Sequence, residues 1–164
     1  MSSARWIAPA NWPVVGAGLV MAAIDDVLLV HAGEGLTDEA FDRHIVELTK
    51  AIDGRLDDAR IGVIYADPHM ALTRTPRRRA EAARALDPRR DKLVRTTAGF
   101  VLVTDSAFSR AALRAYFQIS PPPYPWWVRA SVAEALRVLA PVVEGLDEAR
   151  VLERWTALVR KHAA

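Results

Sequence analysis

Short apolar runs alternate with stretches of helical periodicity along this chain of 164 residues, and that alternation constrains its fold most strongly. Ile61–Ala66 is almost entirely apolar, which predicts a strand buried on both faces. Further strands are predicted at Phe100–Thr104 and, more briefly, at Trp126–Val128. Strands separated by helices form a mostly parallel sheet with helices packed on it, so we predict a single α/β domain.

The N-terminal part of the chain adds antiparallel strands to this sheet. Val14–Val30 is apolar and rich in β-branched residues apart from Asp25-Asp26, which predicts two strands joined by a tight turn at the acidic pair. Gly33–Gly35 then ends the second strand. The predicted architecture is therefore a mixed, mostly parallel sheet of four to five strands flanked by helices.

The helices are predicted from N-cap residues and from apolar side chains at helical spacing. Thr37 begins the first helix and Gly54 ends it. Thr75 and Pro76 begin the second, whose alanines and arginines allow it to cover the sheet only thinly. The remaining helices follow Asp105-Ser106, the proline run at 121–123 and Asp147. Four apolar stripes support these predictions: Phe41, Ile45, Leu48 and Ile52; Phe108, Ala112, Ala115 and Ile119; Val132, Leu136 and Leu139; and Val151, Trp155 and Leu158.

These elements divide the chain into three parts. Residues 1–13 form an N-terminal arm with two tryptophans, and residues 14–140 form the α/β domain. Residues 141–164 form a C-terminal helix that packs on the domain or on a partner. No apolar run approaches the roughly 20 residues of a membrane helix, so we expect no membrane span and a cytoplasmic protein.

Composition and charge narrow the chemistry. The chain has no cysteine, which excludes disulfides and thiolate metal sites. Its charge is segregated: acids outnumber bases by ten to four over residues 1–58, whereas bases outnumber acids by twelve to five over residues 60–114. A basic middle section could meet nucleic acid, an anionic membrane or an acidic protein, or simply face solvent. Its arginines lack the interleaved aromatic residues of single-strand binders, so nucleic acid is the less favoured partner.

Catalytic and cofactor motifs give weak support for an enzyme. Gly16-Ala17-Gly18 lacks the third glycine and the crossover helix of a dinucleotide site. The four histidines show no metal-ligand spacing, and only His69 follows a predicted central strand, where open α/β sheets bind ligands. No nucleophile elbow or P-loop is present. We therefore expect no cofactor, no metal and no catalytic residues.

Three segments together resemble a known group of proteins. They are Gly33–Phe41, Gly99–Ser106 with Arg110, and Pro121–Pro125 leading through Val128 to Ala133–Leu136. Over Val14–Leu139 the chain resembles STAS-like proteins (named for sulphate transporters and anti-sigma-factor antagonists) of myxobacteria and related bacteria. The resemblance implies a four- or five-stranded mixed sheet with helices mainly on one side.

The resemblance also implies a function. STAS domains generally bind partner proteins or nucleotides and do not catalyse reactions. In the anti-sigma-factor antagonists, a phosphorylatable serine in a D-S-S-G-like motif begins the helix after the central strand. The corresponding segment, Asp67–Pro76, has no such motif, and Thr73 and Thr75 are its hydroxyl-bearing candidates.

Three functional hypotheses follow. The first is a non-enzymatic regulatory or scaffolding domain that binds another protein, a second copy of the chain being one such partner. The second is a binder of a small molecule, nucleotide or lipid head group through residues 67–75, and the third is an enzyme with an unrecognised site. The predicted binding residues are those of the loop, the helix start that follows it and the tryptophan pair, one of which should point outward: Asp67, His69, Thr73, Arg74, Thr75, Arg77, Arg78, Trp126 and Trp127.

Overall fold

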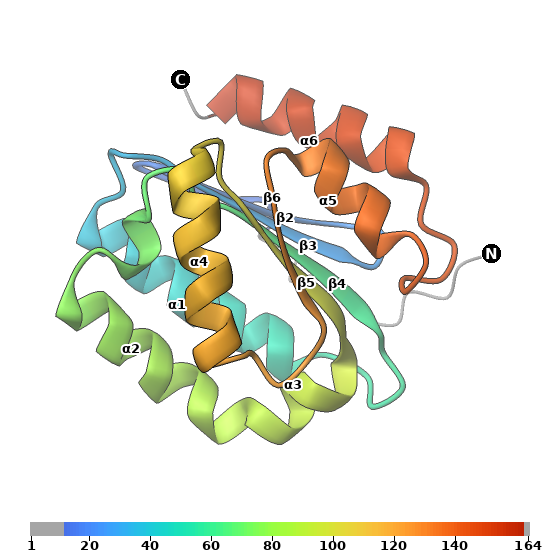
Figure 1. Cartoon of the computed structure of the whole chain (residues 1–164), viewed down its shortest axis with the longest axis horizontal. Helices are drawn as coiled ribbons and strands as arrows, with labels where there is room; N and C mark the ends of the chain where they lie inside the picture. The colour runs from blue at the N-terminus through green and yellow to red at the C-terminus, as the bar shows by residue number, and fades with distance from the viewer. Residues whose placement is uncertain (1–11, 163–164) are drawn as a thin grey trace.

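The first three strands of the sheet are antiparallel and the last three continue it in parallel. In the computed structural model, which describes residues 12–162, the antiparallel strands are β1 (Val14–Gly16), β2 (Leu19–Ile24) and β3 (Val27–Ala32). β4 (Ile61–Ala66), β5 (Thr97–Val103) and β6 (Trp126–Arg129) follow in parallel. Their spatial order is their sequence order. Figure 1 labels β2 to β6 and the helices around them.

The described residues thus form six strands, where the sequence predicted four to five. The difference lies at Gly18, which has a φ of +75° and turns the chain between β1 and β2. The apolar run before Asp25 was predicted as one strand because Ala17-Gly18 carries no polar turn residue. The turn at Asp25-Asp26 is confirmed, and so is the interior position of β4, which pairs with β3 on one side and β5 on the other.

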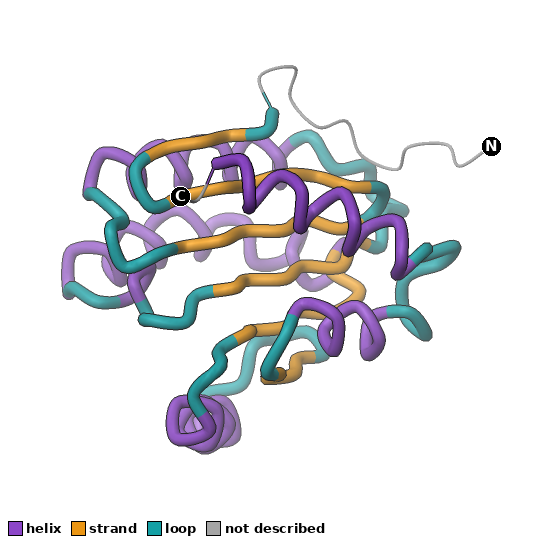
Figure 2. Tube along the Cα trace, turned by 90° about the horizontal axis from the view of Figure 1, so that it is seen from above, coloured by secondary structure: helices purple, strands orange, loops and turns teal. Residues whose placement is uncertain are grey.

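Helices cover both faces of the sheet, as Figure 2 shows. One face packs against α1 (Asp38–Asp53), α2 (Pro76–Leu86) and α4 (Ala107–Ile119). The short helices η1 (Ala71–Thr73), η2 (Asp87–Arg89) and α3 (Arg90–Thr96) flank α2 in the chain. The other face packs against α5 (Val132–Leu139) and α6 (Glu148–His162). The sheet is therefore covered on both sides, and not mainly on one side as the resemblance implied.

Alternating side chains of the central strands form the two cores. Ile61 and Val63 of β4 pack with the α1 side, whereas Ile64 packs with the α5 and α6 side. On that second side, Val151 and Trp155 of α6 are almost completely buried against the sheet and α5. The C-terminal helix therefore belongs to the same packed unit as the strands.

α4 packs differently from the pattern its sequence suggests. The stripe with Phe108 and Ile119 turns away from the sheet, and these two side chains are 85% and 86% exposed. Leu113 is the buried residue of this helix, and Phe117 packs with it against Val128 of β6. α4 covers only the edge of the sheet, so one narrow side of the helix suffices for its packing.

The tryptophan pair at the start of β6 divides between the two faces. Trp126 packs against Phe117 of α4, with ring centroids 5.1 Å apart. Trp127 packs on the opposite face, in the core that contains Leu139 of α5. Both side chains are half-buried, so the expected outward tryptophan is covered.

The remaining expectations concern the ends of the chain and the membrane. Of the predicted arm at residues 1–13, all but Trp12 and Pro13 lie outside the described residues. Trp12 donates a hydrogen bond from Nε1 to Oε2 of Glu47 on α1, at 3.3 Å. Within residues 12–162, no helix combines the length and the apolar character needed to cross a membrane.

Candidate functional site

A cavity of about 490 Å³ lies between the sheet and the helices α1, α2 and α4. Its origin can be followed to the sequence of α2, Pro76–Leu86, which is composed mainly of arginine and alanine. Only Arg78 of this helix is buried, so α2 places few large apolar side chains over β4 and β5. The space that a leucine-rich helix would fill remains open.

Aromatic and aliphatic side chains form most of the cavity wall. Phe41 and Leu48 of α1 stand on one side, Phe100 of β5 forms part of the floor, and Leu113 and Phe117 of α4 stand on the other side. Cavities of this size and character are typical of small-molecule sites, which use a few polar groups to orient the ligand. The polar groups of the inner wall are His44, Tyr65, Asp67 and Tyr124.

His44 is an uncharged member of this wall. It is 3% exposed, and its burial lowers its pKa from 6.5 to about 4. Nδ1 lies 3.2 Å from Sδ of Met21. A thioether sulfur can accept a hydrogen bond but has no proton to donate. Nδ1 is therefore the protonated ring nitrogen, and Nε2 is the acceptor. Nε2 makes no hydrogen bond with a described residue, which leaves it available to a ligand hydroxyl or amide.

Tyr65 and Tyr124 add two phenol groups. Tyr65 continues the α1-facing side of β4 and meets the ring of His44 edge-on, with centroids 5.8 Å apart. Tyr124 precedes β6 and packs on Phe100. Burial raises the pKa of both phenols, so both stay protonated at neutral pH. Neither hydroxyl is hydrogen-bonded to any of residues 12–162, and both can donate to a ligand.

Asp67 is the predicted loop residue that lies deepest in the structure. It is 2% exposed and lines the cavity at the end of β4. Burial raises the pKa of its carboxyl, while two backbone hydrogen bonds act in the opposite direction. These bonds come from the N–H groups of Ala71, at 2.7 Å, and Leu72, at 3.1 Å. The carboxylate therefore serves to begin η1 and to hold the loop over the cavity.

The other residues of the predicted loop are at its surface. Thr73 lines the cavity rim, where its carbonyl accepts a hydrogen bond from Arg79 at 2.8 Å. His69 and Arg74 are exposed, and Arg74 donates to the carbonyl of His69 at 3.4 Å. Of the predicted loop residues, the structure thus brings Asp67 and Thr73 to the cavity.

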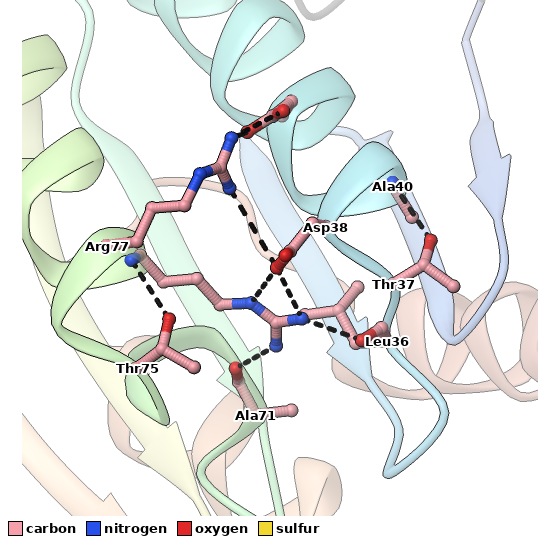
Figure 3. A network of polar contacts seen from close by, with 9 residues as sticks. Leu36, Thr37, Asp38, Ala40, Ala71, Thr75 and Arg77 are labelled. Atoms are coloured by element: carbon pink, nitrogen blue, oxygen red, sulfur yellow. Dashed lines mark hydrogen bonds and ion pairs between the residues drawn. The ribbon is translucent and has the colours of Figure 1, made fainter.

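Thr75, Arg77 and Arg78 hold helices together. Thr75 caps α2 by accepting from the N–H of Arg78 at 3.2 Å. Arg77 pairs with Asp42 of α1 at 2.8 Å, and Arg78 donates to Asp38 at 3.0 Å. Figure 3 shows Arg77, Thr75 and Asp38 within this network of polar contacts. Arg78 is 6% exposed and also donates to the carbonyls of Leu36 and Ala71. Its donors are directed to intramolecular acceptors, whereas Arg77 is accessible.

Trp126 and Trp127 are not brought to the loop. They lie in β6, and Trp126 reaches the cavity only through Phe117, which lines it. Among residues 12–162, no cluster of histidine and carboxylate side chains could hold a metal ion.

Sequence reasoning missed His44, Tyr65 and Tyr124 as site residues. His44 lies on the apolar stripe of α1, three residues after Phe41 and four before Leu48. That spacing alone predicts a buried ring, and Tyr65 similarly continues the alternation of Ile61 and Val63. Tyr124 lies within a proline-rich connector and gave no comparable signal.

Comparisons of the chain with protein-family models, with curated proteins and with solved structures found no match. The geometry of the cavity is therefore the basis for the functional proposal.

Proposed function

We propose that this domain binds a small, largely apolar molecule in the cavity between α1, α2 and α4, and acts without catalysing a reaction. The observation that carries the proposal is an apolar space of about 490 Å³ in which His44 Nε2 and the hydroxyls of Tyr65 and Tyr124 have no partner among the described residues. Buried polar groups are usually hydrogen-bonded, and a ligand would supply the missing partners.

The lining also supports binding over catalysis. Thr73 is the aliphatic hydroxyl of the wall, and within the described chain it forms no hydrogen bond with a histidine or carboxylate that could activate it. This proposal selects the small-molecule hypothesis and shifts its site inward. The loop supplies Asp67, Met70, Leu72 and Thr73 to the wall, and most of the other lining residues come from α1, α2, β5 and α4.

A fluorescence titration tests the proposal. N-phenyl-1-naphthylamine is uncharged, apolar and fluorescent when it leaves water, so we expect a saturable rise of emission at one probe per chain. Ala82→Trp places a large side chain in the cavity from α2 and should abolish the rise without lowering the melting temperature. Ala80→Trp, on the exposed side of the same helix, is the matched control and should bind normally. Equal binding by the two variants would exclude the cavity.

A second candidate function is association with a second copy of the chain through α4. The exposed stripe has large side chains at its ends, Phe108 and Ile119, and alanines 112 and 115 between them. Arg110 and Arg114 donate to carbonyls of Thr104 and Val128, so their guanidinium groups lie on the sheet side and the stripe is uncharged. An antiparallel copy would place each Phe108 against the partner's Ile119, as a two-fold interface requires.

Sedimentation equilibrium tests this association. We expect a concentration-dependent dimer that Phe108→Asp abolishes and that Leu56→Asp leaves intact, because Leu56 is an exposed apolar residue outside α4. A chain that stays monomeric at its highest soluble concentration, or a dimer that tolerates Phe108→Asp, would exclude this interface.

A further inference from the structure

Among residues 12–162, Arg55 is a buried cation without a counter-ion. It follows Gly54, the C-cap of α1, and is 3% exposed. Nη1 donates to the hydroxyls of Thr96, at 3.1 Å, and Thr97, at 3.2 Å, while Nε has no hydrogen-bond partner in the described part of the chain. No carboxylate among residues 12–162 forms an ion pair with it. Arg78, the second buried arginine of the described chain, has both a carboxylate and two carbonyls as acceptors, so Arg55 differs from it.

An unpaired buried charge is costly to the fold. Removing an ion from water costs several kcal/mol even after the protein relaxes, and two neutral hydroxyls return only part of that. The cost is visible in the Arg55 pKa, which burial lowers to about 10, and the side chain nevertheless stays charged at neutral pH. An anion that binds nearby would offset this cost, and its binding would be strengthened accordingly.

Arg55 is hydrogen-bonded to Thr97 at the start of β5, the strand whose Phe100 ring meets the rings of Tyr65 and Tyr124 at the tyrosine end of the cavity. Its charge acts on the hydroxyls of both Tyr65 and Tyr124, and Arg90 acts on Tyr124 as well. The two phenols line the cavity and have no hydrogen-bond partner in the described chain. This end of the cavity therefore combines two free O–H donors with positive charge behind them, which is the combination that a carboxylate accepts from.

The remainder of the cavity requires an apolar body on the ligand. Phe41, Leu48, Leu113 and Phe117 offer no hydrogen bonds. Asp67 is the acidic group of the wall, and its carboxylate is held by the N–H groups of Ala71 and Leu72 at the start of η1. An anionic head is repelled from Asp67 and attracted to Arg55. Arg79, the cation that lines the cavity, lies at its rim and donates to the carbonyl of Thr73.

We propose that the cavity takes an amphiphilic monocarboxylate, with its carboxylate at the hydroxyls of Tyr65 and Tyr124 beside Arg55 and its apolar body between α1 and α4. The proposal rests on the proposed function, since it names the class of ligand for the same cavity. It treats Tyr65 and Tyr124 as direct contacts and Arg55 as the source of the charge that selects the anion.

Isothermal titration of the full chain with decanoate and with decan-1-ol at pH 7.5 tests the proposal. The two probes have the same chain length and differ in the head group, so their affinity ratio reports the recognition of the carboxylate. We expect decanoate to bind at least tenfold more tightly. Arg55→Met should reduce that ratio to near one, whereas Arg60→Met should preserve it, because Arg60 is exposed and caps the carbonyl of Arg95.

The stability of the variant separates recognition from a structural role. Replacing an unpaired buried charge by an apolar side chain of similar length is often neutral or stabilising, so ligand-free Arg55→Met should melt at or above the temperature of the unchanged protein. If Arg55→Met does not fold, Tyr65→Phe and Tyr124→Phe carry the test, since each removes one donor and should lower the affinity for decanoate several-fold more than that for decanol.

The outcomes are distinguishable. Equal affinity for decanoate and decanol, or a ratio that survives Arg55→Met or both tyrosine variants, overturns the carboxylate assignment and leaves the apolar cavity as a binding site. Failure of both probes, together with failure of the naphthylamine titration, overturns the proposed function itself.

Discussion

Arg78 of α2 donates from Nε to Oδ1 of Asp38 in the first turn of α1, at 3.0 Å, and so connects the two helices that border the cavity. The same guanidinium reaches the carbonyls of Ala71, at 2.6 Å, and Leu36, at 2.8 Å. It also lies over the ring of Phe41, 5.7 Å from the centroid. One side chain thereby joins the loop after β4, the start of α1 and α2.

Arg78→Ala should therefore destabilise the fold by about 3 kcal/mol, because two carbonyls and a carboxylate lose a charged donor. Arg77→Ala is the matched control: Arg77 is the neighbouring residue, its pair with Asp42 is exposed, and its loss should have little effect. Urea unfolding measures both. Similar midpoints for the two variants would show that burial of Arg78 contributes nothing to stability.

His44 should make the fold sensitive to mild acid. Its pKa is lowered to about 4 by burial, so as the pH falls through 6.5 the unfolded chain gains a proton that the folded chain does not. The contribution of neutral His44 to the free energy of unfolding is fully present above pH 6.5, and it falls by up to about 3 kcal/mol as the pH approaches 4. His44→Leu removes the titration, so its unfolding free energy should change less between pH 7.5 and 5 than that of the unchanged protein. Parallel curves for the two proteins would contradict this account.

Trp155→Ala tests how firmly α6 belongs to the domain. Trp155 is 3% exposed in the core between α6, α5 and the sheet, and such truncations typically cost about 3–5 kcal/mol. Thr156→Ala, one residue further along and exposed, should change little. Thermal unfolding followed by circular dichroism compares the two. A Trp155→Ala variant that melts with the unchanged protein would mean that α6 adds nothing to the stability of the sheet.

The order of strands and helices was predictable because apolar periodicity reports burial directly. β4 has six residues that are apolar or aromatic, and its neighbours β3 and β5 cover both of its edges as predicted. The apolar stripe of α4 was likewise expected to be buried, but the structure exposes it. Periodicity shows that a face of a helix is apolar and does not show whether anything covers that face. Leu113 and Phe117, the residues that pack, are only four positions apart and gave a shorter pattern.

The cavity was less accessible to sequence reasoning, because it arises from what α2 lacks. Pro76–Leu86 was predicted to cover the sheet thinly, and the cavity beneath it is the physical consequence. The burial of Arg55 was even harder to predict from the sequence. This residue stands between Gly54 and Leu56 in a polar segment that suggests solvent exposure, and only the folded chain brings Thr96 and Thr97 to it from 41 and 42 residues away.

Gly18 gives the sharpest test of the extra strand. Its φ of +75° favours glycine, and a Cβ at this position would lie 2.3 Å from the backbone nitrogen of Leu36, where neither backbone can yield cheaply. Gly18→Ala combines left-handed strain, which alone costs about 1–3 kcal/mol, with that clash. We therefore expect a loss of at least about 2 kcal/mol in urea unfolding. Gly35→Ala is the control from the adjoining loop, because a Cβ there meets nothing within 4 Å.

The clash at Gly18 involves the residue next to Thr37, the N-cap of α1, so amide exchange should also increase in the first turn of α1. Equal stability of the two variants would mean that β1 and β2 join through a different turn, and the six-stranded order would lose its first strand.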